Sequence, residues 1–379
     1  MKILERSYRP GDERSINALY KLITGRDRRL EEYKWEWIDT WNGPGSIWLA
    51  FDEERKKGDQ LIMQYSLIPV PFSLYGESYL AGKTENCMAH PDCRGKGLYY
   101  IHEKKYFETA KNRFSIFFTT TGNVAQGAPG AVRRKLGYTP FDSWRTLYFF
   151  VDQTAVNTNI TKKARSKKWK LMLSISKPFL SFYFFIFSPT HAKTGSAIVK
   201  EENAPLNDIE HLWEKNMKFH GVTVYRSKNY LDWRINKNPY VKHNYLLYRI
   251  DGALKGYIIF YKENDRTVRI VDAFAERKDS KILRRMIREL QVWAKENQLE
   301  KISCITNKGN RALIWAFYSL GFLSFNHFSR IKTVINKDNL SQKKPFHVYI
   351  SNSVYKKHSG LHKARNWYMT ELVFEGRKN

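Results

Sequence analysis

The chain has 379 residues, and 65 Lys and Arg against 37 Asp and Glu give it a net charge of +28. Apolar residues make up 42% of the chain and aromatic residues 15%, which excludes a disordered polyelectrolyte. The length suggests two domains. The excess positive charge requires an acidic partner, and composition leaves nucleic acid, an anionic membrane and a phosphorylated ligand open.

Cysteine usage and the N-terminal residues predict a reducing, cytoplasmic location. Cys87, Cys93 and Cys304 are the three thiols, and they form no C-x-x-C pair. We therefore expect neither a disulfide framework nor a metal site. The first residues, MKILERSYRPGDERS, are too polar for a signal peptide.

The first 150 residues have the pattern of a mixed α/β unit. A short strand at residues 1–9 is followed by a helix at residues 13–23, whose apolar residues share one face. Further strands are predicted at residues 46–52, 60–70, 79–90, 115–120 and 144–151, and further helices at residues 97–111 and 131–135.

The pattern of strands and helices stops between residues 153 and 195. Lys162–Lys170 is a basic run, and Phe179–Phe187 is apolar but about half the ~20 residues that span a bilayer. Two interpretations remain open for this segment. It is a crossover packed between two domains, or a basic and aromatic element that lies on an anionic membrane surface.

The second half of the chain repeats the first. The aromatic stretch Tyr230–Arg234 matches Tyr33–Trp37, and the sequence Leu320-Gly321-Phe322 matches Leu136-Gly137-Tyr138. Residues 281–297 form a clear amphipathic helix. An internal repeat explains this order. The predicted parts are an N-terminal domain at 1–152, a linker at 153–195, a C-terminal domain at 196–340, and a basic extension at 341–379 that closes a sheet.

The segment CMAHPDCRGKGLY, residues 87–99, lies between a predicted strand and a predicted helix. Gly95 and Gly97 allow the backbone to turn with its N–H groups pointing inward, toward the positive end of the helix. Arg94 and Lys96 add positive charge. We name residues 94–98 the cradle. Their backbone N–H groups and positive charges suit a pyrophosphate. An ordinary tight turn has the same composition and is the alternative.

The order of these motifs resembles the GNAT acyltransferase superfamily. The matching residues are Ala89-His90-Pro91, Arg94-x-x-Gly97, Asn123 and Leu136-Gly137-Tyr138. The resemblance covers most of residues 1–150 and, more weakly, residues 197–335. It implies a mixed α/β fold with two GNAT-like domains, each a mostly antiparallel twisted sheet flanked by helices.

The resemblance also implies a coenzyme A thioester as co-substrate. The residues it assigns to the coenzyme are Arg94, Gly95, Lys96, Gly97 and Leu98 for the pyrophosphate, Cys87, Met88 and Ala89 for the pantetheine arm, and Asn123 at the start of the second motif. Tyr99 departs from the family pattern, because a small residue usually stands at this position. The matching segment of the second copy, residues 275–281, contains no glycine. We therefore expect one coenzyme site per chain, with the second copy supplying acceptor surface.

Acyl transfer to an amine requires a base, and Glu85 on the strand beside the cradle is the first candidate. An ion pair with Lys83 is the alternative role for this carboxylate. His90 is a second candidate base, since imidazole titrates near neutral pH. The family's usual tyrosine acid is missing at Val132 and Arg133. Tyr318 of the second copy is a candidate acid, with core packing as its alternative.

The tryptophans at positions 35, 37, 41 and 233 carry two interpretations, stacking on a sugar or base, or packing in the core. The function we expect is transfer of an acyl group from coenzyme A to a primary amine on an anionic acceptor. A nucleotide-linked or lipid-linked amino sugar fits that description. Two alternatives stay open: a Fem-type transferase that uses aminoacyl-tRNA, and a non-catalytic protein that binds nucleic acid or membrane. We expect no specific nucleic acid partner, and peripheral membrane contact remains open.

Overall fold

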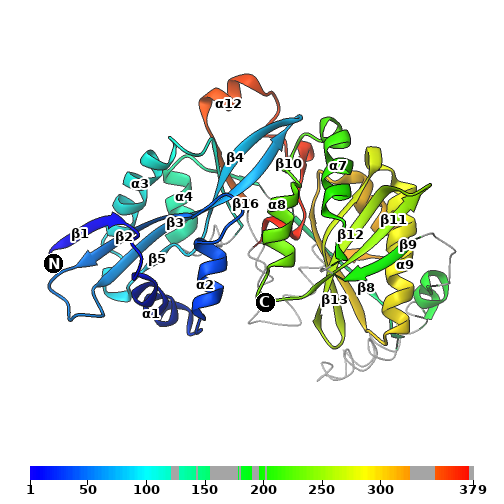
Figure 1. Ribbon diagram of the computed structural model, residues 1–379, viewed down its shortest axis with the longest axis horizontal. Helices are drawn as coiled ribbons and strands as arrows, with labels where there is room; N and C mark the ends of the chain where they lie inside the picture. The colour runs from blue at the N-terminus through cyan, green and yellow to red at the C-terminus, as the bar shows by residue number, and fades with distance from the viewer. Residues whose placement is uncertain are drawn as a thin grey trace. The chain divides into compact units, whose positions relative to one another are not determined.

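The computed structural model describes residues 1–120, 128–141, 144–153, 178, 181–189, 196–200, 203–324 and 346–374. The chain forms two compact units, and each combines segments from both halves of the sequence (Figure 1). Unit 1 contains residues 1–142, 221–240 and 343–366, and unit 2 contains residues 143–220, 241–342 and 367–379. The division therefore differs from the predicted boundaries, which follow chain order. The predicted basic run at 162–170 lies outside the described residues.

Unit 1 is built on one twisted sheet with helices on both faces. Its strands are β1 (Ile3–Ser7), β2 (Ser46–Asp52), β3 (Leu61–Leu74), β4 (Glu77–Thr84), β5 (Met88–Ala89), β6 (Ile116–Thr119), β7 (Thr139–Phe141), β10 (Val222–Val224) and β16 (Phe346–Ile350). Its helices are α1 (Glu13–Thr24), α2 (Leu30–Trp37), η1 (Pro91–Cys93), α3 (Leu98–Ala110), α4 (Ala128–Lys135), α8 (Lys228–Leu231), η4 (Asp232–Asn236), α12 (Asn352–Lys357) and η7 (Ala364–Asn366).

The strands of this sheet run in the order β1-β2-β3-β4-β6-β16-β7, and β5 and β10 also pair with β3. Every residue of β3 is buried, because α1 and α2 cover one face of the sheet and α3 and α4 cover the other (Figure 1). On the α3 side the core contains Trp48, Tyr65, Phe107 and Phe117.

Unit 2 repeats this plan with a sheet in the order β15-β8-β14-β13-β12-β11-β9. The strands of this sheet are β8 (Trp144–Phe150), β9 (Ser196–Lys200), β11 (His243–Ile250), β12 (Ala253–Asn264), β13 (Thr267–Ala275), β14 (Lys301–Asn307) and β15 (Leu323–Ser324). Unit 2 also contains β17 (Trp367–Tyr368), which is not part of this sheet. Its helices are α7 (Leu206–Asn216), η3 (Met217–Phe219), η5 (Glu276–Lys278), α9 (Ser280–Glu296), α10 (Arg311–Ser319), η8 (Glu371–Val373) and a helix at residues 181–187.

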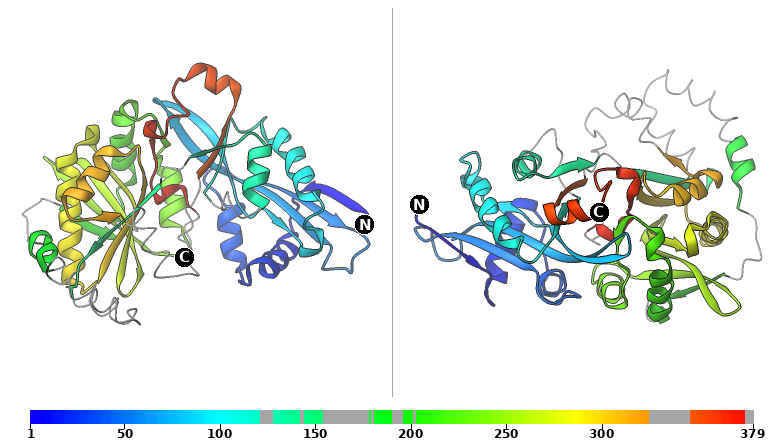
Figure 2. Two further views of the ribbon diagram at one scale, coloured as in Figure 1. Left: turned by 180° about the vertical axis from the view of Figure 1, so that it is seen from behind. Right: turned by 90° about the horizontal axis from the view of Figure 1, so that it is seen from above.

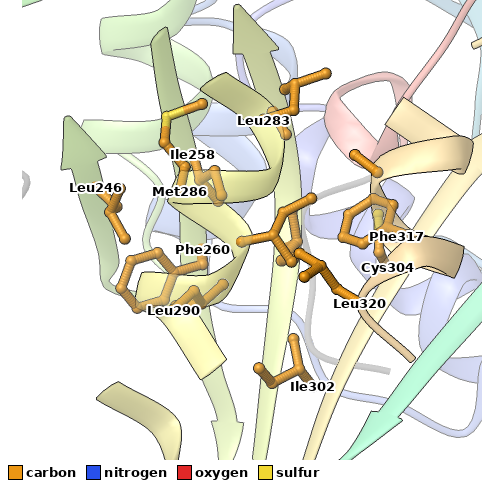
Figure 3. Close-up of a cluster of buried hydrophobic side chains, with 14 of the residues drawn as sticks. Leu246, Ile258, Phe260, Leu283, Met286, Leu290, Ile302, Cys304, Phe317 and Leu320 are labelled. Atoms are coloured by element: carbon orange, nitrogen blue, oxygen red, sulfur yellow. The ribbon is translucent and has the colours of Figure 1, made fainter. Parts of the chain in front are cut away.

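The predicted amphipathic helix is confirmed as α9. Its apolar seam of Ile282, Met286 and Leu290 is buried against the sheet, where Ile258 and Phe260 project from β12 (Figure 3). Within the described residues, no helix is long and apolar enough to cross a membrane.

The two sheets exchange one strand each. Strand β8 follows the first copy of the repeat in sequence, yet it pairs with β14 and β15 in unit 2. Strand β16 follows the second copy, yet it pairs with β6 and β7 in unit 1. Figure 2 shows β16, in orange-red next to α12, beside the blue and cyan strands of the first copy. Each sheet is therefore completed by a strand from the opposite half of the chain.

Each unit contains one parallel strand pair whose pairing stops partway. In unit 1 the pairing of β4 with β6 covers Ala81–Lys83 and Ile116–Phe118. In unit 2 the pairing of β13 with β14 covers Thr267–Ile270 and Lys301–Cys304, and both strands continue beyond it. In unit 1 both strands end one residue after their last pair, at Thr84 and Thr119, whereas in unit 2 the strands run on without pairing and leave an opening.

The opening of unit 2 is filled by the chain's own C-terminal segment, residues 367–374. The amide of Asn307 in β14 donates to the Met369 carbonyl (3.1 Å), and its side chain bonds Trp367 O (2.6 Å) and Met369 N (3.0 Å). On the other side, Thr370 donates to the Asp272 carboxylate in β13 (2.8 Å). Residues of both diverging strands thus bind the same segment.

Replacing Phe346 by Ala should destabilise unit 1 by about 3–5 kcal/mol, because the ring is 2% exposed and packs against Phe118 and Phe141. Urea unfolding measures the change. The matched variant Phe219→Ala, at a ring that is 43% exposed, should stay within about 0.5 kcal/mol of the wild type. Equal effects of the two variants would contradict the placement of β16.

Asn307→Ala should cost about 1–3 kcal/mol in unfolding free energy, since it leaves the Trp367 carbonyl and the Met369 amide without their partner. Asn297→Ala is the control, because Asn297 lies at the exposed end of α9 and makes one bond to Trp293 O. A cost for Asn307→Ala no larger than that of the control would show that the C-terminal segment is not held in the opening.

Candidate functional site

The cradle lies at the start of α3, with Gly97 as the residue that precedes the helix. Gly95 (φ 77°) and Gly97 (φ 74°) both adopt the left-handed backbone conformation that favours glycine. A Cβ atom built on either residue would meet nothing within 4 Å. The two glycines therefore serve the backbone path and leave open space above it.

The amides of Gly95 to Tyr99 donate to no acceptor in the described part of the chain. The first-turn N–H groups of a helix need partners from outside it, and together with the helix dipole they favour an anion. The Arg94 amide differs, because it donates to the Pro91 carbonyl (3.1 Å). The available donors are thus shifted by one residue from the predicted set Arg94–Leu98.

Some charged side chains near the cradle form an ion pair, and others do not form one within the described residues. Arg55 is bound by the Asp92 carboxylate (2.7 Å), and this hydrogen bond lowers the pKa of Asp92 below its usual value. Arg94 and Lys96 are exposed and form no ion pair among the residues the structure describes. Their charges remain available to a bound anion.

Tyr99 does not cover the cradle with its hydroxyl end. Its ring packs against two buried clusters that include Tyr65, Met63 and Cys93, and its hydroxyl group is buried without a hydrogen-bond partner. Burial raises the pKa of Tyr99 well above its usual value, so the phenol stays neutral. The departure from the family pattern is thus accommodated inside the core.

The predicted continuous strand at 79–90 is divided into β4 and β5 by a bulge at Glu85–Cys87. Asn86 has φ 45°, and its side-chain oxygen, with the amide oriented to satisfy both donors, accepts bonds from Arg28 (2.8 Å) and Trp37 (3.2 Å). β5 continues along β3, the strand that β4 also pairs with, but it does not pair with β6 as β4 does. The bulge thus lies between two segments that pair with the same strand.

A buried polar cluster lies behind this bulge. Arg133 of α4 forms an ion pair with Glu103 of α3, and its guanidinium donates to the Cys87 sulfur (3.3 Å). Nearby, Thr84 and Tyr138 share a hydroxyl contact of 3.3 Å. Sequence reasoning missed Arg133 as a site residue. The available signal was its position in the second motif, where the family's tyrosine is absent.

The candidate catalytic residues are placed separately. Glu85 is buried and forms an ion pair with Lys83, which is the alternative role weighed for it. His90 caps the short helix η1, accepting from the Asp92 amide (3.3 Å), and its other ring nitrogen lies 3.3 Å from Arg55. Asn123 lies outside the described residues.

Tyr318 belongs to α10 of unit 2 and is 42% exposed, so core packing is wrong for this residue. It faces outward because the buried face of α10 is occupied by Leu313, Ala316 and Phe317.

Two of the four tryptophans singled out in the sequence pack against each other. Trp35 and Trp233 stack at 5.4 Å and exchange hydrogen bonds between each indole and the other's carbonyl (2.8 and 2.9 Å). The core interpretation of this pair is confirmed.

The counterpart of the cradle in unit 2 has a different chemistry. The carboxylate of Asp279 caps α9 by accepting from the amides of Lys281 (2.7 Å) and Ile282 (3.4 Å). A carboxylate already satisfies this helix end and repels a phosphate. No group of side chains suited to a metal ion occurs in the described ranges.

Scans of protein-family models and of curated proteins found no match to the chain. Solved structures do match. A GCN5-related N-acetyltransferase from Anabaena variabilis has a TM-score of 0.61 and 12% identity, covering 93% of this chain and 74% of that one. N-myristoyltransferase from Saccharomyces cerevisiae, with bound myristoyl-CoA and inhibitors, has a TM-score of 0.51 and 11% identity, covering 92% and 80%.

A tandem GNAT protein from the clavulanic acid biosynthesis pathway has a TM-score of 0.51 and 11% identity, covering 92% of this chain and 98% of that one. At such identities the similarity concerns the fold. It agrees with the repeated strand order and with the mixed α/β prediction. The chain consists of two GNAT folds in tandem.

Proposed function

We propose that unit 1 binds the diphosphate of an acyl-coenzyme A at the cradle and that the acyl group is transferred to a primary amine. The observation that supports this is the set of amides from Gly95 to Tyr99 at the start of α3, which donate to no acceptor in the described residues. The equivalent helix end of unit 2 is satisfied by Asp279, and residues 367–374 fill the space between β13 and β14 there. One coenzyme site per chain follows from this difference.

The chemistry can be assigned to the chain's own groups. The amides of the cradle and the charges of Arg94 and Lys96 hold the diphosphate, and the edge of β5 bonds the amides of the pantetheine arm. The amine nitrogen then attacks the thioester carbonyl, the C–S bond breaks, and the thiolate leaves. Glu85 or His90 takes the proton that the ammonium must lose. Arg133, beside Cys87, is a cation that stabilises the leaving thiolate.

The acceptor is proposed to carry negative charge in addition to its amine. The net charge of +28 favours a phosphorylated molecule, and a nucleotide-linked or lipid-linked amino sugar has both features. The matching solved structures share only the fold with this chain. The acceptor class therefore rests on charge alone.

Coenzyme A should raise the melting temperature of the wild-type protein, and Gly97→Val should abolish the rise, because a β-branched residue at φ 74° forces the cradle out of shape. At about 100 times Kd, ligand binding stabilises by roughly 2.7 kcal/mol. Gly58→Val is the matched control, since Gly58 also has a left-handed φ (99°) and open space around it. The control should retain the rise. A wild-type protein without any shift at millimolar coenzyme A would refute the proposal.

Glu85→Gln should lower kcat/KM by about 10²–10⁴ and remove its rise with pH, if Glu85 is the base. The assay monitors thiol release from acetyl-CoA with a nucleotide-linked amino sugar as acceptor. Lys83→Met tests the ion pair alone. If Glu85→Gln and Lys83→Met both change the melting temperature but leave the pH profile of kcat/KM unchanged, Glu85 is not the base. His90 is then the remaining candidate base.

Mass spectrometry of the purified protein for bound acyl-CoA would report the donor and the site together. A Fem-type donor is the alternative that a gel shift with aminoacyl-tRNA tests. Binding that persists at physiological salt, together with no response to coenzyme A, would favour that alternative. Binding that disappears at that salt indicates nonspecific attraction to the basic chain.

A further inference from the structure

The helix at residues 181–187, SFYFFIF, is apolar on both of its faces. Its inner face packs on unit 2, where Tyr183 and Phe187 lie against the core and the Tyr183 hydroxyl donates to Gly321 O (2.8 Å). Its outer face carries Phe182 (63% exposed), Phe185 (83%) and Ile186 (48%). The spacing i, i+3, i+4 places these three side chains together. A helix that is apolar all round is normally covered on every side.

Two further exposed aromatic side chains lie on α10, a helix whose end contacts the short helix. Trp315 (56% exposed) and Tyr318 (42%) are three residues apart and share the outer face of that helix. The two helices are neighbours, because a Cβ on Gly321, at the end of α10, would lie 2.5 Å from the Phe187 ring. We name Phe182, Phe185, Ile186, Trp315 and Tyr318 the aromatic face.

Positive charge borders the aromatic face on α9. The Arg284 guanidinium lies 5.5 Å from the centre of the Trp315 ring, and Arg288 approaches Ser188 O (3.5 Å) just after the short helix. Burial and then the nearby Arg284 lower the pKa of Arg288, which shows two like charges in proximity. Neither arginine has an ion-pair partner within the described ranges.

We propose that the aromatic face and these arginines form a docking surface for an anionic lipid bilayer. Aromatic rings and arginine side chains suit the interface between lipid headgroups and acyl chains, and the absence of a carboxylate partner leaves both charges for acidic headgroups. The short helix is about 10 Å long, so it lies in the interface and does not span it. This inference stands apart from the proposed acyl transfer, since all of its residues belong to unit 2.

The test is flotation of the full chain with phosphatidylcholine vesicles that contain phosphatidylglycerol, and with pure phosphatidylcholine vesicles as reference. The wild type should float with the acidic vesicles and much less with the neutral ones. The triple variant F182S/F185S/I186S should remain in the dense fraction. Arg284→Gln and Arg288→Gln should each weaken partitioning about fivefold at low salt. Phe219→Ser is the control, because this exposed ring (43%) of unit 2 lies outside the aromatic face and its loss should change nothing.

Circular dichroism and melting of the triple variant establish that it is folded, and Trp315→Phe supplies a second readout. If Trp315 enters the interface, the fluorescence blue shift on addition of acidic vesicles should be smaller in Trp315→Phe than in the wild type. Failure of the wild type to float with acidic vesicles would overturn the proposal. So would equal flotation with neutral vesicles, or a concentration-dependent dimer that the triple variant abolishes, which would assign the surface to a second copy of the chain.

Discussion

The structure depends on one backbone constraint, the divergence of two parallel strands. In unit 2, β13 and β14 stop pairing after Ile270 and Cys304, and the main-chain groups beyond that point need partners from elsewhere. In unit 1, β4 and β6 end one residue after their last pair, and the chain bulges at Asn86 and continues along β3 as β5. Further along the chain, the amides of Gly95 to Tyr99 at the start of α3 donate to no acceptor in the described residues, and such a helix N-terminus suits an anion.

The two units show the same constraint with two outcomes. In unit 2 the diverging strands bind residues 367–374 through main-chain and side-chain hydrogen bonds, and Asp279 satisfies the helix end. In unit 1 glycines replace the capping carboxylate, and the amides after Arg94 have no acceptor among the described residues. A few residues thus distinguish the two copies of the fold. One copy satisfies this helix end with its own carboxylate, and the other leaves the amides there without an acceptor in the described residues.

Local sequence patterns predicted much of this arrangement. Period-2 and period-3.6 apolar spacing located most strands and α9, and the two glycines of the cradle predicted a turn before α3, where the structure has positive φ at both. The strand exchange could not be predicted, because alternation tells which face of a strand is buried but not which strand lies beside it. The ion pair between Arg133 and Glu103 could not be predicted from the sequence either. Charged residues normally lie on the surface, and only the packing of α4 against α3 buries them together.

The strand exchange also bears on how the protein is made. During synthesis residues 1–152 emerge first, but the place between β6 and β7 is filled by residues 346–350, which emerge only after the second copy of the repeat. Until then two strand edges of the nascent first sheet lack their final partner, and such edges are prone to aggregation. The first sheet therefore reaches its native pairing only after the second copy has been made, and a chaperone that shields open sheet edges should raise the yield of folded protein.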